Sequence, residues 1–152
     1  AYSRVGICLI NVKRISEGIS NLQKSQNLLL ELTAKEPKNL AYKRDLARLF
    51  VRFGDGQTLD KNYAAAVESY QKSADLFETI GMTDEKNTLA KRDTAQSLKS
   101  VGETYLKMNE TKKAKIAYQK ASEILQDLIS QNALGELDRK MFDNVQAALQ
   151  KL

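Results

Sequence analysis

The side chains of this sequence best able to do chemistry are basic, and they recur at a fixed spacing. Arg44, Arg92 and Lys140 are 48 residues apart. A second series precedes them by one position: Lys43, Lys91 and Arg139. On three adjacent helices roughly 10 Å apart, such cations would form a ladder for the carboxylates or phosphates of an acidic peptide. The structural alternative is that each Arg bridges to an acidic residue of the preceding helix while each Lys stays solvated, because charge runs are usually solvated surfaces or weak pairs.

Residues for catalysis are scarce. The 152-residue chain contains no His and one Cys. A Ser/His/Asp triad, a zinc site with His ligands and an internal disulfide are therefore excluded. Cys8 is expected to be a small packed residue, and carboxylates such as Asp55 and Glu103 have no predicted pocket or opposing partner. We expect no enzyme activity, no cofactor, no metal site and no small-molecule substrate.

The composition is that of a helical globular domain. Hydrophobic residues make up 42% of the chain and charged residues 28%. The formal net charge of +5 is too mild to indicate nucleic-acid binding without clustering. No apolar run reaches the roughly 18 residues of a membrane span. With one Pro, seven Gly and many helix formers, the sequence predicts a single all-α domain over residues 1–152.

The spacing of 48 is an internal repeat. Gln23, Gln71 and Gln119 each precede a Lys at this spacing. Within each period, apolar residues recur twice at helical spacing, so each period predicts a helix pair. The predicted helices cover about 1–11, 15–34, 40–59, 62–80, 88–107, 111–131 and 137–151. Turns are expected at 109–111 and, between periods, at Glu36-Pro37 or Gly81, with Asn39 and Asn87 as N-caps.

The third copy of the repeat carries the fullest motif. Its residues are Leu98, Val101-Gly102, Tyr105, Ala114, Tyr118 and Ala121. At these residues the chain resembles the tetratricopeptide repeat family, although its period is longer than the family's usual one. The resemblance implies a right-handed α-α superhelix of three helix pairs, with repeats at about 1–39, 40–87 and 88–135 and a capping helix at 136–152. The long period is similar to repeat arrays appended to some bacterial serine/threonine kinases and related signalling proteins.

The resemblance also implies which residues pack and which bind. Packing at the crossing within each pair is assigned to glycines, which let the backbones approach, and to small or aromatic residues facing them: Gly6, Gly54, Gly102, Ala66, Ala114, Tyr70 and Tyr118. The family binds peptides on its concave surface, whose contact positions fall at Ser3, Ile7, Asn11, Arg48, Val51, Asp55, Gln96, Lys99 and Glu103. Arg44, Arg92 and Lys140 extend that surface. The family's clamp for chaperone C-termini is not expected, because Ser3 and Ile7 stand where it needs Lys and Asn.

The function expected from this resemblance is a non-catalytic scaffold that binds a protein or peptide, possibly acidic, on its concave face. One alternative is a basic helical-repeat module for RNA or another acidic polymer, although base-reading repeats need systematic polar pairs. Another alternative is a self-assembly element. Ala1–Gly6 reads as the middle of a helix, so we expect the chain to be part of a longer protein.

Overall fold

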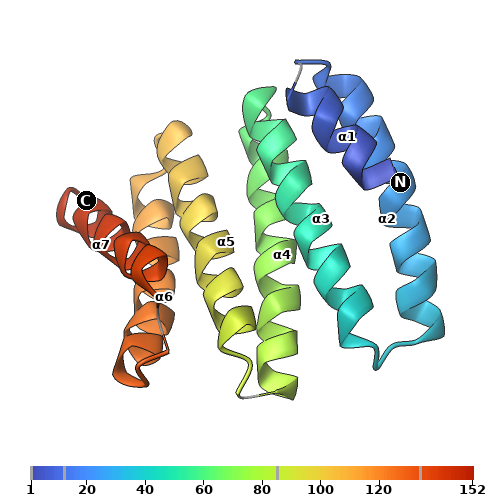
Figure 1. Ribbon diagram of the computed structural model, residues 1–152. Helices are drawn as coiled ribbons and strands as arrows, with labels where there is room; N and C mark the ends of the chain where they lie inside the picture. The colour runs from blue at the N-terminus through green and yellow to red at the C-terminus, as the bar shows by residue number, and fades with distance from the viewer. Residues whose placement is uncertain (1, 12, 85, 134) are drawn as a thin grey trace.

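The computed structural model describes residues 2–11, 13–84, 86–133 and 135–152, which form seven α-helices and no strand (Figure 1). The helices are α1 (Tyr2–Asn11), α2 (Ile15–Lys35), α3 (Leu40–Leu59), α4 (Tyr63–Thr83), α5 (Thr88–Lys107), α6 (Thr111–Ser130) and α7 (Glu136–Gln150). The predicted all-α class and the predicted helix positions are confirmed to within three residues. The predicted start of the first helix at Ala1 lies outside the described residues.

The helix ends show where the local sequence decided the fold. The side chains of Asn39 and Asn87 accept hydrogen bonds from the backbone N–H groups of Ala41 and Ala90, so both predicted N-caps are confirmed. The turn expected at Gly81 is wrong, because α4 continues to Thr83. Gly81 keeps a helical backbone, and a Cβ placed there would meet only Ala90 and Lys91 of α5, at 3.7 to 4.0 Å.

The turns inside the helix pairs repeat the period of the sequence. Lys13, Lys61 and Asn109 each lie two residues beyond a first helix and have positive φ values of 64°, 58° and 59°. A left-handed residue at this place commonly ends a helix and lets the chain reverse. Because these residues are 48 positions apart, the repeat is present in the backbone as well as in the sequence.

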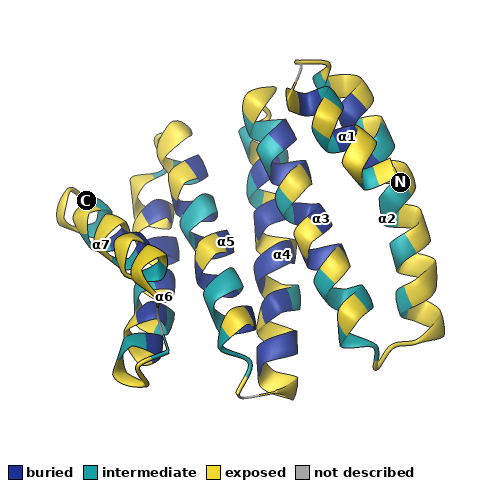
Figure 2. Cartoon of the chain, viewed as in Figure 1, coloured by how far each residue is buried: buried dark blue, intermediate teal, exposed yellow. Residues whose placement is uncertain are grey.

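Packing runs from each helix to the next. Consecutive helices make the main contacts, α1 also touches α3, and α5 also touches α7. The two termini lie at opposite ends of the molecule (Figure 1). Buried positions recur along the row of helices (Figure 2), and the apolar residues of the described chain gather in several clusters. The described helices therefore form a sequential stack whose apolar residues lie in several clusters along its length.

Glycines mark the closest approach within the pairs. A Cβ at Gly54 would lie 2.5 Å from a ring carbon of Tyr70, and one at Gly102 would lie 3.0 Å from the ring of Tyr118. Real Cβ atoms essentially never come as close as at Gly54, so a side chain there requires a shift of Tyr70, whereas at Gly102 the ring of Tyr118 needs to move only by a few tenths of an ångström. At Gly6 the close contact is with the backbone of α2, since an added Cβ would lie 2.8 Å from the carbonyl oxygen of Gly18.

One detail of this packing differs from the expectation. Ala66 and Ala114 were expected to supply the small surface facing Gly54 and Gly102. Both alanines are fully buried, but the nearest atoms to the glycines belong to the tyrosines one turn further along. The glycines therefore make room for flat aromatic rings, which fill the crossing better than a methyl group does.

Candidate functional site

A groove on one side of α5 brings together several of the predicted binding residues. It has a volume of about 280 Å³ and lies between α3 and α5, with Phe77 of α4 contributing to its wall. Four predicted residues line it, Arg48 and Val51 from α3 and Arg92 and Gln96 from α5, together with Arg52, Asp93 and Ser97. Residues three and four apart on a helix share a face, which explains why these positions meet.

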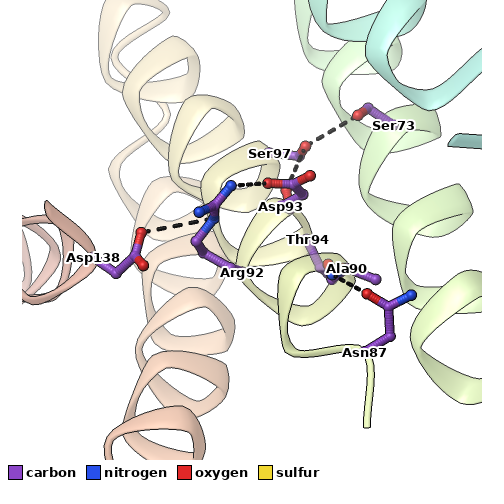
Figure 3. Close-up of polar contacts among 8 residues, drawn as sticks. All are labelled: Ser73, Asn87, Ala90, Arg92, Asp93, Thr94, Ser97 and Asp138. Carbon is purple, nitrogen blue, oxygen red and sulfur yellow. Dashed lines mark hydrogen bonds and ion pairs between the residues drawn. The ribbon is translucent and has the colours of Figure 1, made fainter. Parts of the chain in front are cut away.

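Buried serines fix the position of α5 against α4 beside this groove. The Oγ atoms of Ser73 and Ser97 are 3.1 Å apart, and Ser97 donates to the carbonyl oxygen of Asp93 at 2.9 Å (Figure 3). Because the only hydroxyl proton of Ser97 is used in that bond, Ser73 must be the donor to Ser97. A satisfied buried polar pair resists sliding between helices, so it holds the α5 wall of the groove in register.

Arg92 is held by carboxylates on two helices. Its Nη2 lies 3.1 Å from Oδ1 of Asp93, and its Nε lies 3.7 Å from Oδ1 of Asp138 on α7 (Figure 3). If the basic residues only fix the stacking of the repeats, Arg92 was expected to bridge to an acidic residue of the preceding helix. The observed bridge runs instead to α7, which follows the helix pair α5 and α6. Arg92 therefore links α5 to α7 while also lining the groove.

Arg48 also lines the groove. Its side chain is exposed and forms no ion pair with another described residue. Arg52 beside it pairs with Asp55 at 3.2 Å. Three guanidinium groups thus face one lining carboxylate, that of Asp93, and the groove has a positive balance. The half-buried Val51 supplies apolar surface in the groove, and Phe77 lies buried beneath it.

Other residues expected on the binding surface are engaged within the protein. Asp55 accepts a hydrogen bond from the hydroxyl of Tyr70 at 2.9 Å, and Lys99 pairs with Glu103. These groups do not line the groove. Asp55 instead joins the two helices of its pair, because Tyr70 belongs to α4.

The tyrosines at the crossings have altered acidity. Burial, followed by the nearby carboxylate of Asp55, raises the pKa of Tyr70 well above its ordinary value. Burial, followed by Glu103, raises the pKa of Tyr118 to about 12. Both hydroxyls therefore remain protonated where an exposed tyrosine would ionise.

Arg44, Arg92 and Lys140, which were predicted to form a ladder, differ in their ion-pair partners. Arg44 has no ion-pair partner in the described part of the chain, and Arg92 is bridged as above. Lys140 is exposed and pairs with Glu136 of its own helix. The three were expected on adjacent helices, but α4 lies between α3 and α5, and α6 lies between α5 and α7 in the order of packing. The three cations therefore have different partners.

The second basic series also differs from its expectation. Lys91 was expected to stay solvated, but it pairs with Asp127 of α6 at 3.2 Å. Lys43 and Arg139 form no ion pair with another described residue. On α1, Ser3 and Ile7 are half-buried and Asn11 is exposed, and none of the three lines the groove.

The sequence held a signal for the residues that its analysis missed. Ser97 stands where the neighbouring copies have Leu49 and Val145, and Ser73 stands where the third copy has Ala121. Polar residues at core positions of two successive helices, one in each of two neighbouring repeats, indicate that they contact each other. Arg52 lies one turn after Arg48 and shares its face.

The described residues contain no group of three or more Cys, Asp and Glu side chains placed to hold a metal ion. None of their helices has the length and apolar character that crossing a membrane requires. Comparisons with protein-family models and with curated proteins find no match for this chain.

Proposed function

We propose that the chain is a non-catalytic interaction module of the tetratricopeptide type, built as a right-handed superhelix, which binds an acidic peptide or partner domain. Its architecture is supported by the shared spacing of the left-handed turn residues and of the crossing glycines, both 48 positions apart. Repeat stacks of this kind present extended surfaces for partner proteins.

The observation that carries the proposal is the groove between α3 and α5. Arg48 offers a guanidinium that forms no ion pair with another described residue, and the half-buried Val51 offers apolar contact beside it. A carboxylate can accept two parallel hydrogen bonds from a guanidinium, and an apolar neighbour in the peptide would cover Val51. The preferred ligand is therefore a peptide with Asp, Glu or a terminal carboxylate next to a large apolar residue.

Fluorescence anisotropy with a labelled peptide of alternating Glu and Leu tests this function. Arg48→Glu should weaken binding about tenfold, since a charge-assisted contact becomes a repulsive one. Arg4→Glu makes the same change at an exposed position of α1 outside the groove and should leave binding unchanged. Equal effects of the two substitutions, or no saturable binding by the wild type, would overturn the proposal.

The same assay separates the RNA alternative. A single-stranded RNA that binds with a steep loss of affinity as salt rises, while the acidic peptide does not bind, would favour the basic module. No binding of RNA at low salt removes that alternative.

A second candidate function, self-assembly, is favoured by the face of α1. Tyr2 and Val5 are 45% and 47% exposed, whereas their repeat equivalents Phe50 and Phe53 are 9% and 5% exposed. Phe50 and Phe53 are covered by packing against the preceding helix pair. A second copy that covers Tyr2 and Val5 would remove this apolar surface from water.

Light scattering over a concentration series tests self-assembly. Val5→Lys should lower the average mass at high concentration, while Leu137→Lys, at an exposed apolar position of α7, should not. A mass that stays that of one chain at every concentration would exclude this function.

A further inference from the structure

A second and larger groove lies on the opposite side of α5. It has a volume of about 880 Å³ and runs between α4 and α6 over the first half of α5. Lys91 and Thr94 of α5 face it, whereas Arg92 and Gln96 face the first groove. At about 100° per residue these two sets point to opposite sides of the helix. The two grooves therefore share α5 as a common wall.

The floor and walls of this α4–α6 groove are largely apolar. Phe77 lies beneath it in the core and is only 2% exposed, Ile124 lines its α6 side, and Met82 of α4 is 74% exposed at its edge. The hydroxyl of Thr94 donates to the carbonyl oxygen of Ala90 at 2.9 Å, so its proton is already used. An apolar side chain that enters the groove would remove the exposed surface of Met82 and the partly buried side chain of Ile124 from water.

Gly81 helps to keep the groove open. It is a lining residue without a side chain, and a Cβ added there would still have ordinary contact distances. Its repeat equivalents, Thr33 and Ile129, both carry branched side chains. The second copy of the repeat thus lacks a side chain at a position where the other copies have one.

The charges of the groove are opposite in sign to those of the first. Glu78 on α4 and Glu123 on α6 are exposed, and neither forms an ion pair with another described residue. Asp127 is engaged by Lys91, which leaves Lys86 as the remaining lining cation. The unpaired charges are therefore mainly negative, whereas the groove between α3 and α5 is dominated by arginines.

We propose that the α4–α6 groove is a second docking site, which takes a peptide segment with a large apolar side chain flanked by Lys or Arg. The apolar residue would lie on Met82 and Ile124, and the flanking cations would lie near Glu78 and Glu123. The only lining residue that this groove shares with the groove between α3 and α5 is Phe77, which is buried. With both, the chain joins two partners of opposite charge across α5.

Methionine methyl signals in an NMR titration test the site directly. The probe is an amphipathic peptide with Leu at helical spacing and Lys at its polar positions, and the control peptide has Glu in place of each Lys. The Met82 methyl signal should shift and saturate with the Lys peptide, while those of Met108 and Met141, which do not line the groove, should not. No saturable shift of Met82, or an equal response to the Glu peptide, would overturn the proposal.

Matched variants separate this site from general attraction to a basic peptide. Glu78→Lys with Glu123→Lys should weaken the Lys peptide about tenfold, because two exposed complementary contacts are lost. Glu31→Lys with Asp143→Lys changes the net charge equally at exposed positions outside the groove and should have much less effect. An equal loss in both double variants would show that the peptide responds only to net charge.

A third variant tests the shape of the groove. Gly81→Ile gives α4 the side chain that the third copy has at Ile129, and it should abolish the Met82 response by filling the groove. Binding of the acidic peptide should survive all of these changes. If Gly81→Ile abolishes the binding of both peptides, the substitution has damaged the fold. The double variant Glu78→Lys with Glu123→Lys then tests whether the α4–α6 groove binds the Lys peptide.

Discussion

Gly54 and Gly81 both lie inside helices, yet a methyl group added at each would meet different surroundings. At Gly54 the new Cβ would lie 2.5 Å from the buried ring of Tyr70. At Gly81 the nearest atom, Cγ of Lys91, would be 3.7 Å away, which is an ordinary contact. The same substitution should therefore change stability in opposite directions.

We expect Gly54→Ala to lower the free energy of unfolding by about 1–3 kcal/mol, because the ring of Tyr70 must shift within a packed crossing. Gly81→Ala should raise it by about 0.5–1 kcal/mol through better helix propensity. Gly102→Ala should fall between them, since its closest contact is 3.0 Å. Urea denaturation followed by circular dichroism gives all three values. Equal effects at the three sites would contradict this view of the crossings.

The buried tyrosines make stability sensitive to alkali. Their pKa values in the folded chain exceed the ordinary value of about 10, that of Tyr118 reaching about 12. Above about pH 10 these tyrosines lose their protons in the unfolded chain but keep them in the folded chain. The free energy of unfolding is therefore unchanged below about pH 10 and falls as the pH rises further. The urea midpoint of the wild type should drop steeply over this range. Tyr70→Phe with Tyr118→Phe should drop less, and an equal slope would show that other groups control the effect.

At the scale of the element, the turn inside each helix pair carries a local cost. Lys61 has a φ of 58°, a conformation that costs an ordinary L-residue roughly 1–2 kcal/mol and glycine almost nothing. The reversal itself is held by backbone bonds from the N–H of Lys61 to the carbonyl oxygen of Thr58 and from that of Asn62 to Gln57. These bonds do not need the Lys side chain.

Lys61→Gly should therefore raise the free energy of unfolding by about 0.5–1 kcal/mol, after the greater freedom of glycine in the unfolded chain is subtracted. Asn109→Gly should gain less, because Asn tolerates this conformation better than Lys does. Thermal melting of the two single variants makes the comparison. A loss of stability in Lys61→Gly would show that its side chain stabilises the turn.

At the scale of the whole molecule, stability is expected to be local because packing runs between neighbouring helices. The last helix, α7, covers one cluster in which Leu125 and Leu128 are fully buried. The other clusters lie among the earlier helices and receive no residue from α7.

Deletion of residues 136–152 should expose Leu125 and Leu128 and loosen α6, while α1 to α4 keep their structure. Hydrogen exchange should report faster exchange in α6 and nearly unchanged protection in α3 and α4. A truncated chain that loses helical structure throughout would contradict the sequential stack, because that result requires one shared core.

How much could be read from the sequence varies along the chain. The helices, the two asparagine caps and the crossing glycines were predictable because each depends on periodicity or on a few neighbouring residues. Gly81 was misread as a turn because a glycine that ends a helix and one that faces a neighbouring helix look alike in sequence. The Ser73 and Ser97 contact was visible only as two polar residues in otherwise apolar positions.

The sequence by itself determined the all-α class, the helix positions to within three residues and a repeat of 48 residues, since these follow from local propensity and spacing. Tertiary structure alone decided which charges are engaged: Arg92 with Asp138, Lys91 with Asp127, and Asp55 with Tyr70. It also decided that the two faces of α5 open into grooves of opposite charge. Pairing between charges on different helices depends on how those helices are placed in space, which spacing along a single helix does not specify.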